Sequence, residues 1–274
     1  MATGPADSNA EDVSLDLARE LTQAIEDEQF FLVYQPTIDL QTNAFAGVEA
    51  LIRWRHPRRG ILSPDTFIDE LEASGQIMPV GRWALNTACA QGAAWHDKGY
   101  RFSVSVNVSE RQFETPAFFQ DVADALSSSR FDPSLLVLEF AQATLLGGGE
   151  ATAPRLELLR TLGVRFAIDD FEPGGSALDE LEQFPIDIVK LDREFIAGLA
   201  TSSEASSLVH RLVESSEMRH LQVIASGIED SDQREQLQNE KVHVGQGYLF
   251  SKPHEAAEID RFLEDFAIFS GKPL

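Results

Sequence analysis

Eight short runs of apolar and β-branched residues alternate with stretches of helical periodicity along most of the 274-residue chain. The runs are Phe30–Asp39, Gly47–Arg55, Phe102–Asn107, Leu135–Phe140, Arg165–Asp170, Ile186–Asp192, Gln222–Ile228 and Val242–Phe250. Eight strand–helix units in about 250 residues are typical of a closed (β/α)8 barrel, although an open doubly wound sheet shows similar alternation. No Gly-x-Gly-x-x-Gly turn follows the first run, which removes the best support for the open sheet. We therefore expect an α/β fold with a closed, TIM-like barrel.

The chain shows no composition break that would divide it into domains. Residues 1–12 are small, polar and acidic, and have too few apolar side chains to offset the entropy of ordering, so we expect a flexible acidic tail. The alternation then continues without a Pro/Gly/Ser-rich linker, which predicts a single barrel domain over residues 13–274. A final helical pattern favours a helix packed on its own barrel over a docking face for a partner. Its apolar positions are Ile259, Phe262, Leu263, Phe266 and Phe269.

Acidic residues strongly outnumber basic ones. The 22 Lys and Arg residues against 45 Asp and Glu residues give a formal net charge of −23 at pH 7. The negative electrostatic field of such a chain repels polyanions, so we expect neither DNA, RNA nor a membrane as a partner. A phosphate ligand would need cationic side chains close to it. Residues 1–13 carry no basic start or apolar core, so we expect no secretory leader, and no uncharged apolar run of about 18 residues occurs. The single Cys89 cannot form an internal disulfide. Together these features favour a cytoplasmic location.

Polar residues interrupt several of the apolar runs near their carboxyl ends. These residues are Glu49, Asn107, Glu139, Asp169 with Asp170, Lys190 and Gln246. The carboxyl ends of barrel strands meet at one rim, so these groups are expected to converge there. Burying a carboxylate costs several kcal/mol unless it is paired or metal-bound, and a set of oxygen donors suits Mg²⁺ or Mn²⁺. For any one residue a capping or salt-bridging role is the simpler interpretation, but their joint occurrence favours a site.

Other familiar catalytic patterns are absent from the sequence. None of the six histidines lies in a His-Glu-x-x-His motif or has a cysteine at zinc-binding spacing. Neither a phosphate loop ending in Gly-Lys-Ser/Thr nor a Gly-x-Ser-x-Gly nucleophile elbow is present. Zinc, P-loop and serine-nucleophile chemistry therefore have no support.

One basic segment, Arg53-Trp54-Arg55-His56-Pro57-Arg58-Arg59, stands out in this acidic chain. The planar guanidinium of arginine can donate two hydrogen bonds to a phosphate at once. Arg53 is the best ligand candidate, because it follows Glu49 by four residues on the same face of the same predicted strand. For the other three arginines we expect a solvated loop that pairs with nearby acids.

Several motifs occur in an order typical of one family. They are Tyr34-Gln35-Pro36, Glu49-Ala50-Leu51-Ile52-Arg53-Trp54-Arg55-His56-Pro57, Ser105-Val106-Asn107-Val108-Ser109, Leu138-Glu139, Asp169-Asp170-Phe171, Val189-Lys190-Leu191-Asp192 and Gln246-Gly247-Tyr248-Leu249-Phe250-Ser251-Lys252-Pro253. From about Phe31 to Pro253 the chain resembles the EAL domains, which hydrolyse the bacterial messenger cyclic di-GMP. The resemblance implies a barrel of the EAL type, whose first strand runs in an atypical direction and which is often dimeric.

The resemblance also implies roles for individual residues. The positions that match ligands of a first metal ion are Glu49, Asn107, Glu139 and Asp169, and those that match a second are Asp169 and Asp170. Lys190 matches the lysine that orients the attacking water. The positions that match cyclic di-GMP contacts are Gln35, Arg53 and Gln246. In the family mechanism two metal ions polarise a phosphodiester and generate hydroxide for in-line attack, which yields linear pGpG.

Three departures from the family pattern affect the second-metal half of this site. Where the family reads Ala-Glu-Gly-Val-Glu, the chain reads Ala225-Ser226-Gly227-Ile228-Glu229, so a serine replaces the glutamate linked to the second metal and to general-base work. Glu229 remains, three residues further along. After the paired aspartates, Glu172-Pro173 replaces Gly-Thr, which restricts the backbone and predicts another loop path. Gln142 stands where the family has a glutamate that steadies this loop.

These departures lead to one hypothesis and two alternatives. We expect a degenerate EAL-like regulator that keeps its first Mg²⁺ or Mn²⁺ site, lacks the second, and binds cyclic di-GMP or a regulatory protein partner rather than acting as an enzyme. Loss of a metal or a base removes several orders of magnitude in rate. The first alternative is an active, metal-dependent phosphodiesterase in which Glu229 or Glu172 supplies the missing carboxylate. The second is a protein-interaction module that no longer binds nucleotide. A homodimer remains open.

Overall fold

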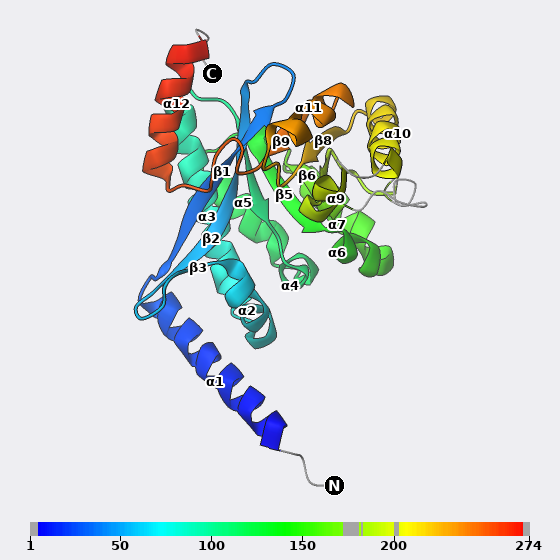
Figure 1. The fold of residues 1–274 in the computed structure, drawn as a ribbon. Coiled ribbons are helices and arrows are strands. Elements are labelled where there is room, and N and C mark those ends of the chain that lie inside the picture. The colour runs from blue at the N-terminus through cyan, green and yellow to red at the C-terminus, as the bar shows by residue number, and fades with distance from the viewer. Residues whose placement is uncertain (1–4, 172–180, 182, 200–202, 271–274) are drawn as a thin grey trace.

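The computed structural model describes residues 5–171, 181, 183–199 and 203–270. Its centre is a nine-stranded sheet in the order β1-β9-β8-β7-β6-β5-β4-β2-β3, and an additional pairing of β1 with β2 closes it into a barrel (Figure 1). The strands are β1 (Phe30–Asp39), β2 (Phe45–His56), β3 (Gly60–Leu62), β4 (Ser103–Asn107), β5 (Leu136–Ala141), β6 (Arg165–Phe171), β7 (Ile188–Leu191), β8 (Gln222–Ala225) and β9 (Val244–Gln246). The predicted closed barrel is confirmed. The short strand β3, which forms a hairpin with β2 outside the ring, was not predicted.

The first strand of the barrel runs opposite to the strands beside it. β1 pairs antiparallel with both β2 and β9, whereas the ladder from β2 through β4 to β9 is parallel. The short turn between β1 and β2 requires this direction, because a parallel connection needs a crossover of about a dozen residues or more. In the turn, Asp39 Oδ1 accepts hydrogen bonds from the backbone N–H groups of Gln41 and Thr42 at 3.0 and 2.7 Å. The expected atypical direction of the first strand is confirmed.

Helices surround the barrel and connect its parallel strands (Figure 1). They are α1 (Pro5–Glu26), α2 (Ile68–Ser74), α3 (Ile77–Asp97), α4 (Glu110–Glu114), α5 (Phe118–Ser129), α6 (Gln142–Gly147), α7 (Thr152–Arg160), α9 (Arg193–Gly198), α10 (Ser203–Arg219), α11 (Ser231–Asn239) and α12 (Ala256–Ser270). Single 3-10 turns occur at Pro64–Thr66, Pro133–Leu135 and Gly149–Ala151. None of the helices in the described part of the chain is long and apolar enough to cross a membrane.

Capping boxes fix two of the loops that leave the carboxyl ends of the strands. The Ser109 hydroxyl accepts a hydrogen bond from the backbone N–H of Gln112 at 3.2 Å at the start of α4, directly after β4. Asp230 Oδ1 accepts one from the backbone N–H of Gln233 at 2.8 Å at the start of α11, after β8. Each cap satisfies a helix N–H group that would otherwise have no partner, and is worth about 1 kcal/mol. These loops are therefore held in place at the carboxyl mouth of the barrel.

The last helix packs on the barrel, as its apolar pattern predicted. Ile259 and Leu263 are fully buried in the main core, and the Phe262 ring lies 6.0 Å from that of Phe45 at the start of β2. Burial of each such side chain contributes roughly 1.5 to 3 kcal/mol. The side chains of Phe266 and Phe269 lie outside the described part.

Helix α1 projects from the body of the barrel (Figure 1), and its last turns pack against it. Leu21 and Ala24 are fully buried in a second apolar cluster with Trp54 and Phe67. Residues 5–12, which composition assigned to a flexible tail, form the first turns of this helix. The flexibility of residues 1–12 and the single-domain organisation of residues 13–274 stay predictions.

Candidate functional site

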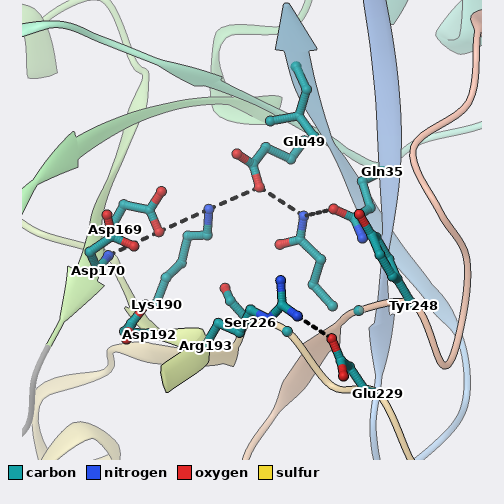
Figure 2. A pocket seen from close by; sticks show the side chains of 14 residues that line it. Gln35, Glu49, Asp169, Asp170, Lys190, Asp192, Arg193, Ser226, Glu229 and Tyr248 are labelled. Carbon is teal, nitrogen blue, oxygen red and sulfur yellow. Dashed lines mark hydrogen bonds and ion pairs between the residues drawn. The ribbon is translucent and has the colours of Figure 1, made fainter. Parts of the chain in front are cut away.

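The predicted strand-end residues meet at the carboxyl mouth of the barrel. They are Glu49 on β2, Asn107 on β4, Glu139 on β5, Asp169 on β6, Lys190 on β7 and Gln246 on β9. Parallel pairing explains their convergence, since neighbouring strands bring their polar residues to one level. For example, Asn107 lies directly opposite Glu139 in the ladder of β4 and β5. A cavity of about 230 Å³ opens at this mouth (Figure 2).

Three carboxylates surround the ammonium group of Lys190, and those of Glu49 and Asp169 are drawn in Figure 2. One oxygen of each of Glu49, Glu139 and Asp169 lies within 4.8 Å of the others. Lys190 Nζ lies 3.0 Å from Glu49 Oε2, 2.5 Å from Glu139 Oε2 and 3.2 Å from Asp169 Oδ1. The Lys190 and Glu139 side chains are only 3% and 2% exposed, so water screens their charges little.

Burial and neighbouring charges shift the pKa values in this cluster. Burial raises the pKa of Glu139 to about 8, and the charges of Glu49 and Asp169 act in the same direction while Lys190 opposes them. Burial also acts to raise the pKa of Glu49, but Lys190 and hydrogen bonds from two amide side chains hold it below its usual value. Burial acts to lower the pKa of Lys190, yet the three carboxylates raise it well above its usual value. Lys190 therefore stays charged, and Glu139 is the carboxyl group most easily neutralised.

The donor set of this cluster fits a divalent cation. A single ammonium group cannot neutralise three carboxylates; burial raises the pKa of Glu139, and the charges of Glu49 and Asp169 add to that shift. Carboxylate oxygens are the ligands that Mg²⁺ and Mn²⁺ prefer. Asn107 Nδ2 donates to Glu49 Oε1 at 2.8 Å, which holds this carboxylate in position. Glu49, Glu139 and Asp169 could thus bind a metal ion.

Two buried glutamines extend the cluster toward β1. Gln246 Nε2 donates to Glu49 Oε2 at 2.8 Å and to Gln35 Oε1 at 3.1 Å. The Oε1 atom of Gln246 is buried and has no hydrogen-bond partner among the described residues. Both glutamines line the cavity, which places polar groups beside the carboxylates.

Arg53 lies beside the cavity, further along β2. Because side chains alternate along a strand, it shares a face with Glu49 and with Leu51, which lines the cavity. Its Nη1 atom donates to the backbone oxygen of Ile52 at 2.7 Å. Burial lowers the pKa of Arg53, although nearby Tyr248 and Glu49 oppose that shift. The guanidinium group is therefore half-buried at the rim, within the electrostatic reach of the cluster.

The other arginines of the basic segment pair with acids, as predicted. Arg55 Nη2 lies 3.2 Å from Glu255 Oε1, and Arg58 and Arg59 both contact Glu20 of α1. The two pairs with Glu20 connect α1 to the hairpin of β2 and β3, outside the cavity.

The opposite wall of the cavity carries the departures at Ser226 and Glu229. Ser226 directly follows β8, and its Oγ atom is buried without a hydrogen-bond partner in the described part of the chain. The Glu229 carboxylate forms an ion pair with Arg193, the first residue of α9 (Figure 2). Arg193 was not singled out from the sequence. Its position three residues after Lys190, where β7 ends and a helix begins, is the signal that could have identified it.

Asp170 adopts an unusual backbone conformation at the end of β6, with φ of 53°. Its N–H donates to Asp169 Oδ1 at 3.1 Å. Burial and the charges of Asp169 and Asp192 raise its pKa. The altered loop that follows, with Glu172 and Pro173, lies outside the described residues. Gln142 begins α6 immediately after β5.

Comparison with known families agrees with this geometry. The sequence model of the EAL domain matches residues 18–253. The chain belongs to the EAL domain family. The resemblance seen in the motifs is thereby confirmed, whereas the degenerate character and the roles of individual residues stay predictions.

Named relatives of this EAL domain include cyclic di-GMP phosphodiesterases. NbdA of Pseudomonas aeruginosa is 35% identical over 95% of the chain and 33% of its own length. PdeR of Escherichia coli is 33% identical over 91% of the chain and 38% of its own length. The chain thus spans about a third of the length of these relatives. The structure titled as the PaMucR phosphodiesterase in complex with c-di-GMP is 35% identical, with a TM-score of 0.85 over 89% of this chain and 99% of that one.

Proposed function

We propose that this EAL domain binds cyclic di-GMP at the carboxyl mouth of its barrel and hydrolyses it very slowly. The support for binding is the set of residues that remains in place on one side of the cavity. Gln35 and Gln246 line it beside Glu49, and Arg53 lies at its rim. A guanidinium group and amide groups suit the phosphodiester and the base edges of a cyclic dinucleotide.

The observation that carries the proposal of slow turnover is the ion pair of Glu229 with Arg193 beside Ser226. A general base must have a free carboxylate within hydrogen-bond reach of the attacking water. Ser226 has no charge, and the Glu229 carboxylate is already bound to a guanidinium group. Glu229 is therefore less available to act as the general base in place of the missing glutamate. We expect the rate of cyclic di-GMP hydrolysis to be lower by about 100-fold or more than in a site with that glutamate.

The intact half of the site would hold one divalent cation. Glu49, Glu139 and Asp169 would supply carboxylate oxygens, and Asn107 an amide oxygen. When bound, such an ion supplies Lewis-acid polarisation of a phosphodiester oxygen. Lys190 would donate hydrogen bonds from its charged Nζ to a water molecule or a phosphate oxygen in the cavity. Gln246 would keep Glu49 oriented through its 2.8 Å hydrogen bond.

The runner-up is an active cyclic di-GMP phosphodiesterase. The observation that favours it is that relatives named as such enzymes match nearly the whole chain, at 33% to 35% identity. In this version Glu229 leaves Arg193, or Glu172 acts as the base. A pure protein-interaction role, a regulatory partner and a homodimer remain further proposals.

One experiment separates these functions. The purified domain is incubated with cyclic di-GMP and Mg²⁺ or Mn²⁺, pGpG is quantified by liquid chromatography, and binding is measured by calorimetry in Ca²⁺. Our proposal expects micromolar binding with turnover about 100-fold or more below that of the NbdA EAL domain assayed in parallel. Comparable turnover would establish the phosphodiesterase instead. If the domain does not bind cyclic di-GMP, the protein-interaction role is the function that remains.

A further inference from the structure

The Arg193 side chain lies across the loop that contains Ser226. At Gly227 a Cβ atom would stand 2.3 Å from Arg193 Cγ and 2.7 Å from Arg193 Cβ. Such distances are too short for any side chain at this position, so the glycine makes room for the aliphatic part of Arg193. Gly227 also has a φ of 77°, a conformation that favours glycine. The arginine is therefore directed along the cavity wall by α9 on one side and by the 226–229 loop on the other.

The guanidinium group of Arg193 has hydrogen-bonding capacity to spare. Its Nη2 atom bonds to Glu229 Oε1, whereas Nε and Nη1 have no acceptor among the residues that the structure describes. The side chain is 63% exposed and lines the cavity. Figure 2 shows it between Ser226 and Glu229, on the same wall of the cavity. An oxyanion in the cavity could therefore accept a hydrogen bond from Nε–H or from Nη1–H.

The charges of the cavity explain what such a cation could do. Asp169, Asp170 and Asp192 all line the same space and would repel a phosphodiester. The family pattern implies a second metal ion at this wall, with a glutamate at the position of Ser226. Here that position is neutral, and the arginine side chain lies against the residue that follows it.

We propose that Arg193 binds a phosphodiester group of the cyclic dinucleotide directly and so replaces a second metal ion in recognition. This inference rests on the proposed binding of cyclic di-GMP. In the free domain Glu229 holds the guanidinium group in position. In the complex, phosphate oxygens accept hydrogen bonds from the free N–H groups of Arg193. They also compete with Glu229 for the N–H groups of Nη2. Arg193 is thus a ligand-binding residue. Glu229 lowers the affinity for cyclic di-GMP, because it competes with the phosphate for the guanidinium group.

The test is calorimetric titration of the whole chain with cyclic di-GMP, once in Mg²⁺ and once in EDTA. We expect Arg193→Ala to weaken binding about tenfold or more in both buffers, because a charge-assisted pair of hydrogen bonds is lost. Arg193→Lys should recover part of this loss, since it keeps the charge without the fork. Glu229→Gln should tighten binding a few-fold, because a neutral amide competes less for the guanidinium group.

Arg101→Ala is the matched control. Arg101 forms a similarly exposed ion pair, with Asp132 at 2.8 Å, before β4 at the opposite end of the barrel, and its loss changes the net charge equally. The affinity of Arg101→Ala for cyclic di-GMP should stay within about twofold of that of the parent chain.

If the parent chain binds cyclic di-GMP and Arg193→Ala binds it equally well, the role of Arg193 is refuted while cyclic di-GMP binding stands. If the parent chain does not bind in either buffer, the proposed function itself fails. Circular dichroism on each variant identifies any loss caused by unfolding.

Discussion

Lys190 Nζ lies 2.5 Å from Glu139 Oε2, in an ion pair that is almost completely shielded from water. The strand β7 brings the lysine to the same mouth as the glutamate of β5, two strands away in the ladder. Burial of two opposite charges costs desolvation energy that their attraction repays only when the geometry is good. The additional contacts of Lys190 with Glu49 and Asp169 make it the cation at the centre of this acidic cluster.

Replacement of Lys190 by methionine should strongly destabilise the metal-free domain. The change keeps the volume of the side chain and leaves three carboxylates without their buried cation, which costs about 3 to 5 kcal/mol. Urea unfolding in EDTA, followed by circular dichroism, measures this loss. The double variant Lys190→Met/Glu139→Gln removes an anion together with the cation, and should recover at least about 1 kcal/mol. Equal unfolding midpoints for Lys190→Met and the parent chain would mean that Lys190 does not offset the negative charge of the three carboxylates.

A divalent cation should stabilise the folded domain through the same carboxylates. At about 100 times its dissociation constant, an ion that binds only the native state adds about 2.7 kcal/mol, or roughly 5 to 10 °C in Tm. Glu139→Gln removes one carboxylate and should abolish most of the shift that Mg²⁺ or Mn²⁺ produces in a thermal melt. Glu255→Gln, an exposed carboxylate outside the cavity, is the control and should keep the full shift. An identical shift in both variants would locate the binding of the ion elsewhere.

The single thiol should be unreactive in the native domain. Cys89 is buried in α3, and burial raises the pKa of its thiol to about 12. Because the thiolate is the reactive form, at pH 8 only about one molecule in ten thousand carries it, and the site is closed to reagents. A chromogenic disulfide reagent should therefore titrate no thiol at pH 8 and one thiol per chain in guanidinium chloride. Rapid reaction without denaturant would show that α3 opens locally.

The barrel and one half of the cavity could be predicted from sequence for a physical reason. Parallel strands place their carboxyl ends at one rim, so polar residues at the ends of apolar runs had to meet. Glu139 interrupts an otherwise apolar, buried strand, and the structure places its carboxylate among those of Glu49 and Asp169. The direction of β1 followed from the family resemblance, and the short turn after Asp39 explains it.

Contacts between side chains on different loops could not be predicted from the sequence pattern. The ion pair of Arg193 with Glu229 joins residues 36 positions apart, and it depends on the path of the 226–229 loop and on the space at Gly227. Neither feature leaves a periodic pattern in the sequence. The central position of Lys190 was missed for a similar reason, because its contacts with three carboxylates depend on side-chain packing inside the barrel. The short strand β3 was too brief for alternation to reveal it.

Restoring the family glutamate at Ser226 should recover little phosphodiesterase activity by itself. The new carboxylate would lie next to Gly227, against which the aliphatic part of Arg193 packs, and we expect the guanidinium group to pair with it. A carboxylate held in this way is a poor general base and a poor metal ligand. Ser226→Glu should therefore raise the rate of pGpG formation by less than about tenfold. The measurement is chromatographic, in Mn²⁺, with Ser226→Gln as the uncharged control of equal size.

Removing Arg193 in the same background tests the reason for this small effect. In Ser226→Glu/Arg193→Ala neither the introduced carboxylate nor that of Glu229 has the guanidinium group as a partner, so the rate should exceed that of Ser226→Glu alone by about tenfold or more. A gain of about a thousandfold in the single variant would contradict the prediction, because it would mean that Arg193 does not hold the new carboxylate and that serine alone limits the rate. Equal rates in the single and double variants would show that the obstacle to catalysis lies elsewhere in the cavity.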